Sequence, residues 1–291
     1  MMWQEYLFPA SVEEAVAMLA QWGGRARLIA GGTDLVLELN EGKREADCLI
    51  DITRIAGLKA IALEGDVITV GAAVTFRQLD DSPLIRQRAT VLAEAAHSVG
   101  SLQIRNVATL GGNVVNALPA ADGSLGLCAL DAEAEIADST GRRWVPLEEL
   151  FVASGQSKID ATAQVLTAFR FRALGSKEGS AYERLARRRA LSLPILACGV
   201  AVGLSEDGRT FQWARISLGP VAPVPFRARQ TEAFLTGAEV STETMVRAGE
   251  IAQSESHPRA SLLRASKEYR QEMIRVLVKR ALERAVEGGL R

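Results

Sequence analysis

Two segments of this sequence each carry a glycine pair that follows an apolar residue and lies near a threonine. The first is Leu28-Ile29-Ala30-Gly31-Gly32-Thr33-Asp34-Leu35, and the second is Ala108-Thr109-Leu110-Gly111-Gly112-Asn113-Val114-Val115-Asn116. Paired glycines adopt positive φ readily and allow close backbone approach, so consecutive N–H groups can point into one concavity. Such a nest binds phosphate oxygens without a basic side chain. Two facing nests suit a pyrophosphate, which favours a fold that brings the two loops together.

Other nucleotide-binding patterns are missing from the sequence. No two of the 25 glycines are separated by a single residue, which excludes the G-x-G-x-x-G fingerprint of nicotinamide Rossmann folds. The phosphate-loop pattern G-x-x-x-x-G-K-S/T is also absent. Lys and Arg together number 34 against 35 Asp and Glu, and this balance argues against a nucleic-acid-binding protein.

The cysteine and histidine content limits metal and redox chemistry. Cys48, Cys128 and Cys198 are far apart and form no C-x-x-C pair, and His97 and His257 are the only histidines. The chain therefore supplies no four-cysteine zinc or iron–sulfur site of familiar spacing, and we expect the cysteines to be small buried residues. We predict no metal ligands and no catalytic residues; G-x-S-x-G is absent, although a dispersed triad stays open.

The sequence also bears on location. An odd number of scattered cysteines fits a reducing compartment, and the N-terminal residues lack the basic and apolar regions of a signal peptide. The longest apolar stretch, residues 191–204, is interrupted by Ser192 and Pro194 and is shorter than the roughly 20 residues that a membrane span needs. We therefore expect a cytoplasmic protein without a membrane span.

The beginning of the chain alternates between strand and helix signals. Ser11-Val12-Glu13-Glu14 is a capping box that opens a helix, and Gly23-Gly24 ends this helix. Short apolar strands are predicted at residues 27–30 and 48–52. This alternation predicts a small α/β lobe.

The remainder of the chain divides into two further parts. Short β segments, a helix near residues 88–99 and a long Gly- and Asn-rich stretch at 100–126 predict an α+β lobe. Residues 175–180 are the best linker candidate, and strands beyond them precede helices, the last with an apolar stripe from Ile274 to Ala285. We divide the chain into a first lobe (1–56), a second lobe (57–174) and a C-terminal domain (180–291).

Four segments of the sequence resemble segments of one known protein family. The string Gln103-Ile104-Arg105-Asn106-Val107-Ala108-Thr109-Leu110-Gly111-Gly112-Asn113 resembles the signature of the FAD-binding medium subunit of molybdenum hydroxylases. That family includes xanthine dehydrogenase, carbon monoxide dehydrogenase and aldehyde oxidoreductases. Ala30-Gly31-Gly32-Thr33-Asp34 resembles its first FAD loop, and Pro119-Ala120-Ala121-Asp122 the stretch after the second. Arg264-Ala265-Ser266-Lys267-Glu268-Tyr269-Arg270 is similar to part of its last domain.

The resemblance implies an α+β fold. Its FAD-binding domain has two lobes of the vanillyl-alcohol-oxidase (PCMH) type, and its C-terminal domain has a three-stranded sheet with helices. The resemblance also implies non-covalent FAD, which takes electrons from the 2Fe–2S clusters of a small partner subunit and passes them to NAD or another acceptor. It further implies that a large partner subunit binds the molybdenum cofactor, and that the three subunits assemble as a dimer of heterotrimers. Within the family the sequence is most similar to xanthine (purine) dehydrogenase subunits.

Several alternatives stay open. The first is the medium subunit of a carbon monoxide or aldehyde dehydrogenase. A free-standing FAD oxidoreductase is the second, and a scaffold without its cofactor is the third. The oxidoreductase is expected to turn over alone, the subunit only with its partners, and the scaffold to be colourless.

The resemblance implies a set of FAD-binding residues. Backbone amides around Gly31, Gly32, Gly111 and Gly112 are expected to hold the pyrophosphate, with side chains of Thr33, Thr109 and Asn113 adding hydrogen bonds. Asp34 is expected to cap the following helix or to orient the loop, because a carboxylate beside phosphates is repulsive. Asp122 has two interpretations, an acceptor for ribityl hydroxyls or the N-cap of a helix that begins near Gly123. The full set is Leu28, Ile29, Ala30, Gly31, Gly32, Thr33, Asp34, Leu35, Thr109, Leu110, Gly111, Gly112, Asn113 and Asp122.

A basic cluster follows the predicted linker. Arg184, Arg187, Arg188 and Arg189 can meet an acidic partner surface or the phosphates of a nicotinamide cofactor, but we interpret them as a solvated strand face. Nearby, relatives often have an acidic residue where this chain has Ser192, and some have an aromatic residue at the position of Leu193. The environment of the flavin is therefore expected to differ from theirs.

The mode of flavin attachment gives a first prediction. His97 precedes the second glycine loop, and we interpret it as structural because the resemblance implies non-covalent FAD. Acid precipitation of the protein is expected to release all the flavin into the supernatant, where absorbance and chromatography identify it as FAD. Flavin that stays in the washed precipitate would overturn this expectation.

Overall fold

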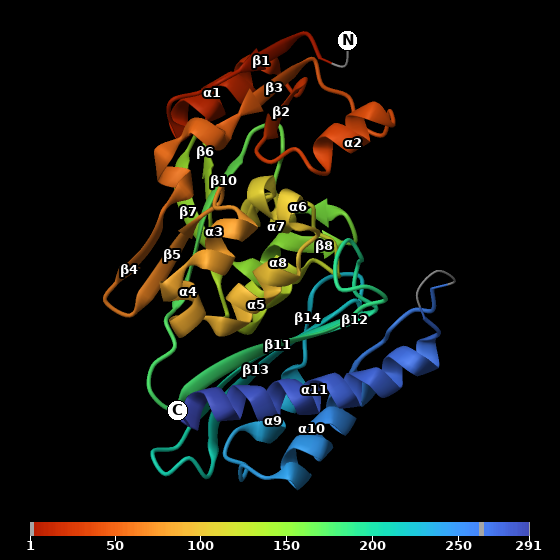
Figure 1. Cartoon of the computed structure of the whole chain (residues 1–291). Helices are drawn as coiled ribbons and strands as arrows, with labels where there is room; N and C mark the ends of the chain where they lie inside the picture. Colours follow the sequence, from red (N-terminus) through yellow and green to blue (C-terminus); the bar gives the residue numbers. More distant parts are fainter. Residues whose placement is uncertain (1–2, 262–264, 291) are drawn as a thin grey trace.

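The first sheet of the protein is small and parallel. The computed structural model describes residues 3–261 and 265–290, and its chain passes from an N-terminal lobe through a middle lobe to a C-terminal layer of strands and helices (Figure 1). The first sheet has the order β1 (Glu5–Leu7), β3 (Cys48–Asp51), β2 (Ala26–Ile29). Helix α1 (Val12–Trp22) covers it with a buried apolar face, and α2 (Leu35–Asn40) follows the first glycine loop.

The expected capping box of α1 is half formed. The Ser11 hydroxyl accepts a hydrogen bond from the Glu14 amide, as predicted, but the Glu14 carboxylate accepts from the Ala10 amide instead of from Ser11. Gly23 ends the helix with a left-handed φ of 54°, a conformation that suits glycine.

The second sheet is antiparallel and has five strands. Its order is β4 (Ile61–Glu64), β5 (Val67–Gly71), β10 (Val165–Arg172), β6 (Glu133–Asp138), β7 (Gly141–Pro146). Helices α3 (Phe76–Asp81), α4 (Pro83–Arg88) and α5 (Thr90–Ser98) follow β5. A short hairpin of β8 (Phe151–Ala153) and β9 (Gln156–Ser157) lies between β7 and β10.

The Gly- and Asn-rich stretch at 100–126 is largely helical. It forms α6 (Leu102–Val107), α7 (Leu110–Val115) and the start of α8 (Asp122–Ala129). All eight residues of α8 are buried. Small residues allow these short helices to pack closely, and tertiary contacts stabilise them despite the low helix propensity of glycine.

The third sheet is antiparallel, with the order β11 (Glu178–Leu185), β12 (Leu196–Leu204), β13 (Phe211–Gly219), β14 (Phe226–Arg227). Its first three strands are long, as expected, and the two-residue β14 adds a short fourth. The predicted linker at 175–180 is shorter than expected, since β11 already begins at Glu178. The Glu178 carboxylate explains this, because it accepts from the Gly175 amide and pairs with Arg172 at the end of β10.

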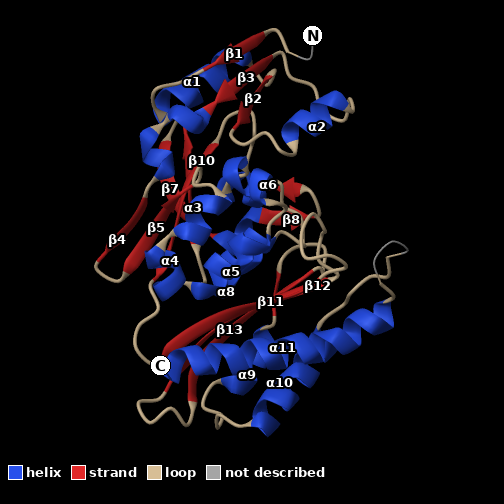
Figure 2. Ribbon diagram, in the orientation of Figure 1, coloured by secondary structure: helices blue, strands red, loops and turns tan. Residues whose placement is uncertain are grey.

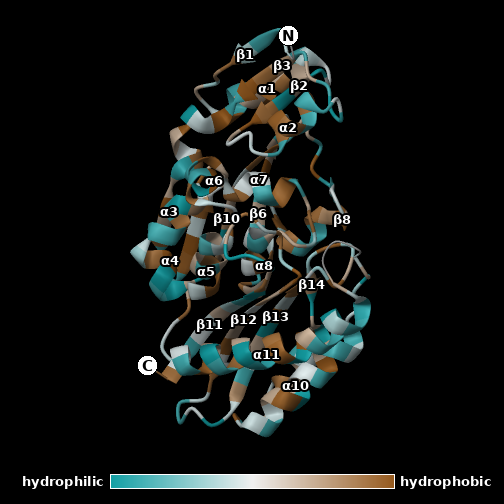
Figure 3. Ribbon diagram, turned by 45° about the vertical axis from the view of Figure 1, so that its right-hand side comes forward, coloured by the Kyte–Doolittle hydropathy of each residue, from teal (hydrophilic) through white to brown (hydrophobic). Residues whose placement is uncertain are grey.

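This third sheet lies between two layers of helices (Figure 2). On one side it contacts α5 and α8 of the middle lobe, and on the other α9 (Arg229–Leu235) and α11 (Lys267–Leu290), against which α10 (Thr242–Glu255) packs. Helix α11 carries hydrophobic and hydrophilic residues along its length (Figure 3), and its buried residues are mostly apolar, with Arg270 as the charged exception. The predicted stripe is confirmed, and its buried members are Ile274, Leu277, Val278, Ala281, Leu282 and Ala285. Arg264 of the family-like segment lies outside the described residues.

The α+β expectation is confirmed, and the division of the chain at residues 56/57 and 174/180 stays a proposal. Cys48, Cys128 and Cys198 are buried, and burial raises the pKa of the Cys128 thiol to about 12, so it stays protonated at neutral pH. In the part of the chain that the structure describes, no helix combines the length and apolar character needed to cross a bilayer.

The packing of β11 against α11 gives a second prediction. A Cβ on Gly179 would lie 2.0 Å from the Ala285 carbonyl oxygen and 2.6 Å from the Gly289 amide nitrogen. Gly179→Ala is therefore expected to lower the free energy of unfolding by about 1–3 kcal/mol, the usual cost of overpacking. Chemical denaturation measures the change. Gly57→Ala is the matched control, because nothing lies within 4 Å of its Cβ position; an equal effect in both variants would contradict the explanation.

Candidate functional site

A single cavity of about 810 Å³ brings together the two glycine loops. Its walls come from the first loop, from α6 and α7, from the β8–β9 hairpin and from the segment between β11 and β12. This volume lies in the range of cofactor-binding cavities. The sequence-predicted residues that line it are Leu28, Ile29, Ala30, Gly31, Gly32, Thr33, Asp34, Leu35, Thr109, Gly111, Gly112, Asn113 and Asp122. Leu110 does not line the cavity, because it is fully buried in the core of the middle lobe.

The first glycine loop presents free donors to this cavity. Among the described residues, the backbone N–H groups of Gly31, Gly32 and Thr33 have no acceptor within the chain. Gly32 has a φ of 66°, which glycine adopts without strain. Three consecutive unpaired amides beside a cavity form a suitable site for an anionic group.

Gly31 also allows the two lobes to touch. A Cβ at this position would lie 2.0 Å from the Val107 carbonyl oxygen and 2.9 Å from the Ala108 Cα. These two residues lead directly into the second glycine loop. The first loop can therefore reach the second only because residue 31 has no side chain.

The second glycine pair has a different role from the expected one. The Gly111 amide donates to the Ala72 carbonyl at 2.8 Å, and the Gly112 amide donates to Thr109 Oγ1 at 3.1 Å. These amides are consumed within the chain, so the expectation that they hold a pyrophosphate needs correction. A Cβ on Gly111 would lie 2.7 Å from the Ala72 oxygen, which shows that this glycine permits close packing of α7.

The polar side chains of the second loop are positioned by hydrogen bonds. Thr109 caps α7 by accepting from the Gly112 amide, and its hydroxyl hydrogen remains available to a ligand. Asn113 accepts from the Ser124 amide at 3.1 Å through Oδ1, which leaves its NH₂ group as a donor. Both side chains can therefore donate into the cavity while their acceptor atoms hold the fold.

Asp34 does not cap α2 as we expected. It occupies the N-cap position, but its side chain makes no capping hydrogen bond. Desolvation and the nearby Glu38 carboxylate raise the pKa of Asp34, and a hydrogen bond from Asn116 acts in the opposite direction. Asn116 lines the same cavity, and no sequence pattern had singled it out.

Asp122 is the first residue of α8, so the N-cap interpretation was wrong; the N-cap is Ala121. The Asp122 carboxylate accepts from the Tyr182 hydroxyl at 2.8 Å and from Arg184 Nε at 2.9 Å. Burial raises the pKa of Asp122, whereas Arg184 and Tyr182 act to lower it. The carboxylate has further lone pairs for a ligand hydroxyl.

Arg184 is not on a solvated strand face. Its side chain is 11% exposed, it lines the cavity, and it also donates to the Ser192 carbonyl. That contact holds the segment 186–195. The segment also binds the middle lobe, because the Leu191 amide donates to the Gly100 carbonyl at 3.0 Å. Arg187, Arg188 and Arg189 lie on this segment and are exposed. The C-terminal part of the chain thus completes the cavity wall.

The chain can be compared with known proteins. Residues 2–171 match the family described as the FAD binding domain in molybdopterin dehydrogenase, and residues 180–285 match the CO dehydrogenase flavoprotein C-terminal domain. The nicotinate dehydrogenase FAD-subunit of Eubacterium barkeri is 34% identical over 244 residues, which are 83% of this chain and 82% of that protein. The putative xanthine dehydrogenase FAD-binding subunit of Escherichia coli (strain K12) is 32% identical over 282 residues, or 96% and 95% of the two chains.

A solved structure is also similar to this chain. It is that of carbon monoxide dehydrogenase from Hydrogenophaga pseudoflava lacking the Mo-pyranopterin moiety of the molybdenum cofactor. This chain superposes on one of its chains with a TM-score of 0.92 and 33% identity, over 98% of each. The similarity therefore extends through the whole fold, including the segment that closes the cavity.

The contact between the two loops gives a third prediction. Gly31→Ala is expected to displace the first loop from Val107 and to weaken FAD binding about tenfold, because overpacking costs about 1–3 kcal/mol and about 1.4 kcal/mol corresponds to a tenfold change. Titration with FAD, followed by flavin fluorescence, measures this. Gly175→Ala is the control, since its Cβ would make only an ordinary contact of 3.5 Å with Glu178. Unchanged affinity in Gly31→Ala would refute the assigned role of the contact.

Proposed function

This chain belongs to the family of FAD-binding medium subunits of molybdenum hydroxylases, and from that premise we propose that it carries the FAD through which electrons pass from a partner's 2Fe–2S clusters to NAD or another acceptor. The cavity carries this proposal, because three unpaired amides and a set of neutral donors face a space of cofactor size. A bound flavin accepts and donates one or two electrons, and the protein binds, orients and shields it.

Different residues of the cavity are proposed to bind different parts of the cofactor. We propose that the amides of Gly31, Gly32 and Thr33 bind the pyrophosphate, with the Thr109 hydroxyl and the Asn113 amide group as further donors. Backbone donors stabilise phosphate charge without a counter-ion. Asp34 also lines the cavity, and a hydrogen bond from Asn116 holds its carboxyl group.

Asp122 is the proposed acceptor for ribityl hydroxyls. Its carboxylate is fixed by Tyr182 and Arg184, so it needs no reorganisation when a ligand binds. Leu191 and Leu193, which line the cavity from the C-terminal part, are proposed to exclude water from the bound cofactor.

We further propose the setting of the reaction. The chain is expected to work in the cytoplasm with a molybdenum-binding large subunit and a 2Fe–2S small subunit, in a dimer of heterotrimers. Xanthine or another purine is the first substrate to test. The medium subunit of a carbon monoxide or aldehyde dehydrogenase is the alternative, supported by the likeness to the Hydrogenophaga pseudoflava structure.

A fourth prediction tests this proposal on the protein purified with whatever accompanies it. Its visible spectrum is expected to show flavin and iron–sulfur absorbance, with one FAD for each copy of this chain. Xanthine is expected to bleach both absorbances under anaerobic conditions, and NAD to restore them. Bleaching by carbon monoxide or an aldehyde instead would select the alternative, and turnover by this chain alone would identify a free-standing oxidoreductase. A colourless protein that takes up no FAD would refute the proposal.

A further inference from the structure

Helix α8 is held at both ends by arginines from the C-terminal part of the chain. At its first residue, the Asp122 carboxylate pairs with Arg184 of β11. At its other end, the Cys128 carbonyl accepts from Arg227 Nη1 at 2.9 Å. Asp122 lines the cavity, whereas Arg227 is not among the residues that do. The helix thus links the cavity to a contact outside it.

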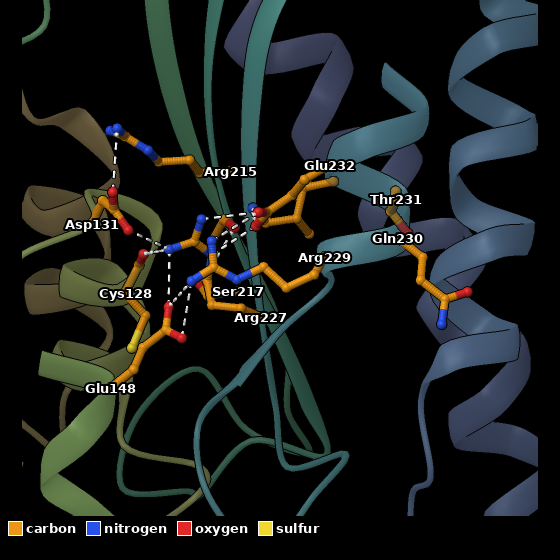
Figure 4. A network of polar contacts seen from close by, with 12 residues as sticks. Cys128, Asp131, Glu148, Arg215, Ser217, Arg227, Arg229, Gln230, Thr231 and Glu232 are labelled. Carbon is orange, nitrogen blue, oxygen red and sulfur yellow. Dashed lines mark hydrogen bonds and ion pairs between the residues drawn. The ribbon is translucent and has the colours of Figure 1, made fainter. Parts of the chain in front are cut away.

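Arg227 is the centre of a buried polar network (Figure 4). Its side chain is only 3% exposed, and its Nε and Nη2 bind the Glu232 carboxylate at 2.6 and 3.0 Å. Nη1 also reaches Asp131 at 2.9 Å and Glu148 at 3.0 Å. Asp131 directly follows α8 and its C-cap, and Glu148 lies in the turn after β7. One guanidinium therefore joins the C-terminal part to three points of the middle lobe.

The geometry of arginine is essential here. A guanidinium presents donors in a rigid planar fork, which suits a bidentate carboxylate and several further acceptors at once. A lysine retains the charge but has a single nitrogen that cannot reach all these groups. Asp131 and Glu148 are 47% and 37% exposed, but Arg227 and Glu232 are only 3% and 10% exposed, so hydrogen bonds lost between this pair are not fully replaced by water.

Helix α8 also has little freedom between its ends. The Ser217 hydroxyl of β13 donates to the Leu125 carbonyl at 2.7 Å. A Cβ on Gly219 would lie 2.1 Å from the Pro119 carbonyl oxygen, just before the helix. With all its residues buried, α8 can move only together with the sheet that Arg227 anchors.

We infer that Arg227 is a positioning residue for the cofactor: through α8 it fixes Asp122 at the cavity wall, and so it sets the affinity for FAD without contacting it. This inference rests on the proposed function, in which Asp122 binds the ribityl chain. When the contacts of Arg227 are weakened, α8 shifts and displaces the Asp122 carboxylate. The C-terminal part of the chain thereby contributes to FAD binding through the helix as well as through the segment 186–195.

A double-mutant cycle provides the fifth prediction. FAD affinity is measured by fluorescence titration on the complete complex after removal of its FAD, for the unmodified chain, Arg227→Lys, Asp122→Asn and the combination. Arg227→Lys is expected to weaken FAD binding about tenfold in the unmodified background. In the Asp122→Asn background, the same change is expected to alter the affinity by less than about twofold, because the group through which it acts is already lost.

Arg172→Lys is the matched control. Arg172 also makes a two-pronged pair across the same boundary, with Glu178 of β11, but it does not contact α8. Its replacement is expected to leave FAD affinity unchanged. Glu232→Gln supplies a second route to loosen the Arg227 fork if Arg227→Lys fails to fold, and it is expected to weaken FAD binding in the same background-dependent manner.

The outcomes separate the inference from the function on which it rests. Equal losses of affinity from Arg227→Lys in both backgrounds would indicate a purely structural role and overturn the inference, as would unchanged affinity. A loss in Arg172→Lys as large as that in Arg227→Lys would also overturn it. Failure of the unmodified complex to bind FAD at all would instead refute the proposed function.

Discussion

Strand β12 is buried on both faces, and the way it is covered joins the last part of the chain to the rest. All nine of its residues, from Leu196 to Leu204, are buried. One face packs against α5 and α8 of the middle lobe, and the other against α11. A strand covered on both sides needs a continuous apolar sequence, and this segment is the longest apolar stretch in the chain. Ala197 belongs to the core of the middle lobe, whereas the alternate residues Leu196, Cys198, Val200, Val202 and Leu204 belong to a second core, so β12 separates two adjoining cores.

The cavity depends on this arrangement. The close approach of Gly31 to Val107 brings the two glycine loops together, and one wall of the cavity comes from the segment that links β11 to β12. Polar contacts also cross the boundary: Asp122 and Arg227 bind partners at the two ends of α8, and the Ser217 hydroxyl donates to the Leu125 carbonyl between them. Apolar packing brings the parts together, and these directional contacts fix their register. A cofactor site shared among separate parts of a chain requires that register.

Much of the fold could be predicted from the sequence. The Ser11 cap and the apolar stripe of α11 arise from local spacing, and the structure contains both of them. The helices α6 and α7 were not predicted, because glycine and asparagine lower helix propensity and only tertiary packing compensates for it. The start of β11 was also missed, since the pair of Glu178 with Arg172 that shortens the linker joins two strands.

For the site, residue types alone indicated which two loops line the cavity. Glycine is required where one backbone closely approaches another, and the glycine pairs are apparent in the sequence. It also determined the family, through the string from Gln103 to Asn113. The three-dimensional structure was needed to show that the amides of Gly31 and Gly32 lack an acceptor within the described chain, whereas those of Gly111 and Gly112 donate to other groups of the chain. It alone also decided that Arg184 pairs with Asp122. The physical reason is that a hydrogen-bond partner is chosen by proximity in space, and residues 62 positions apart carry no local signal of their contact.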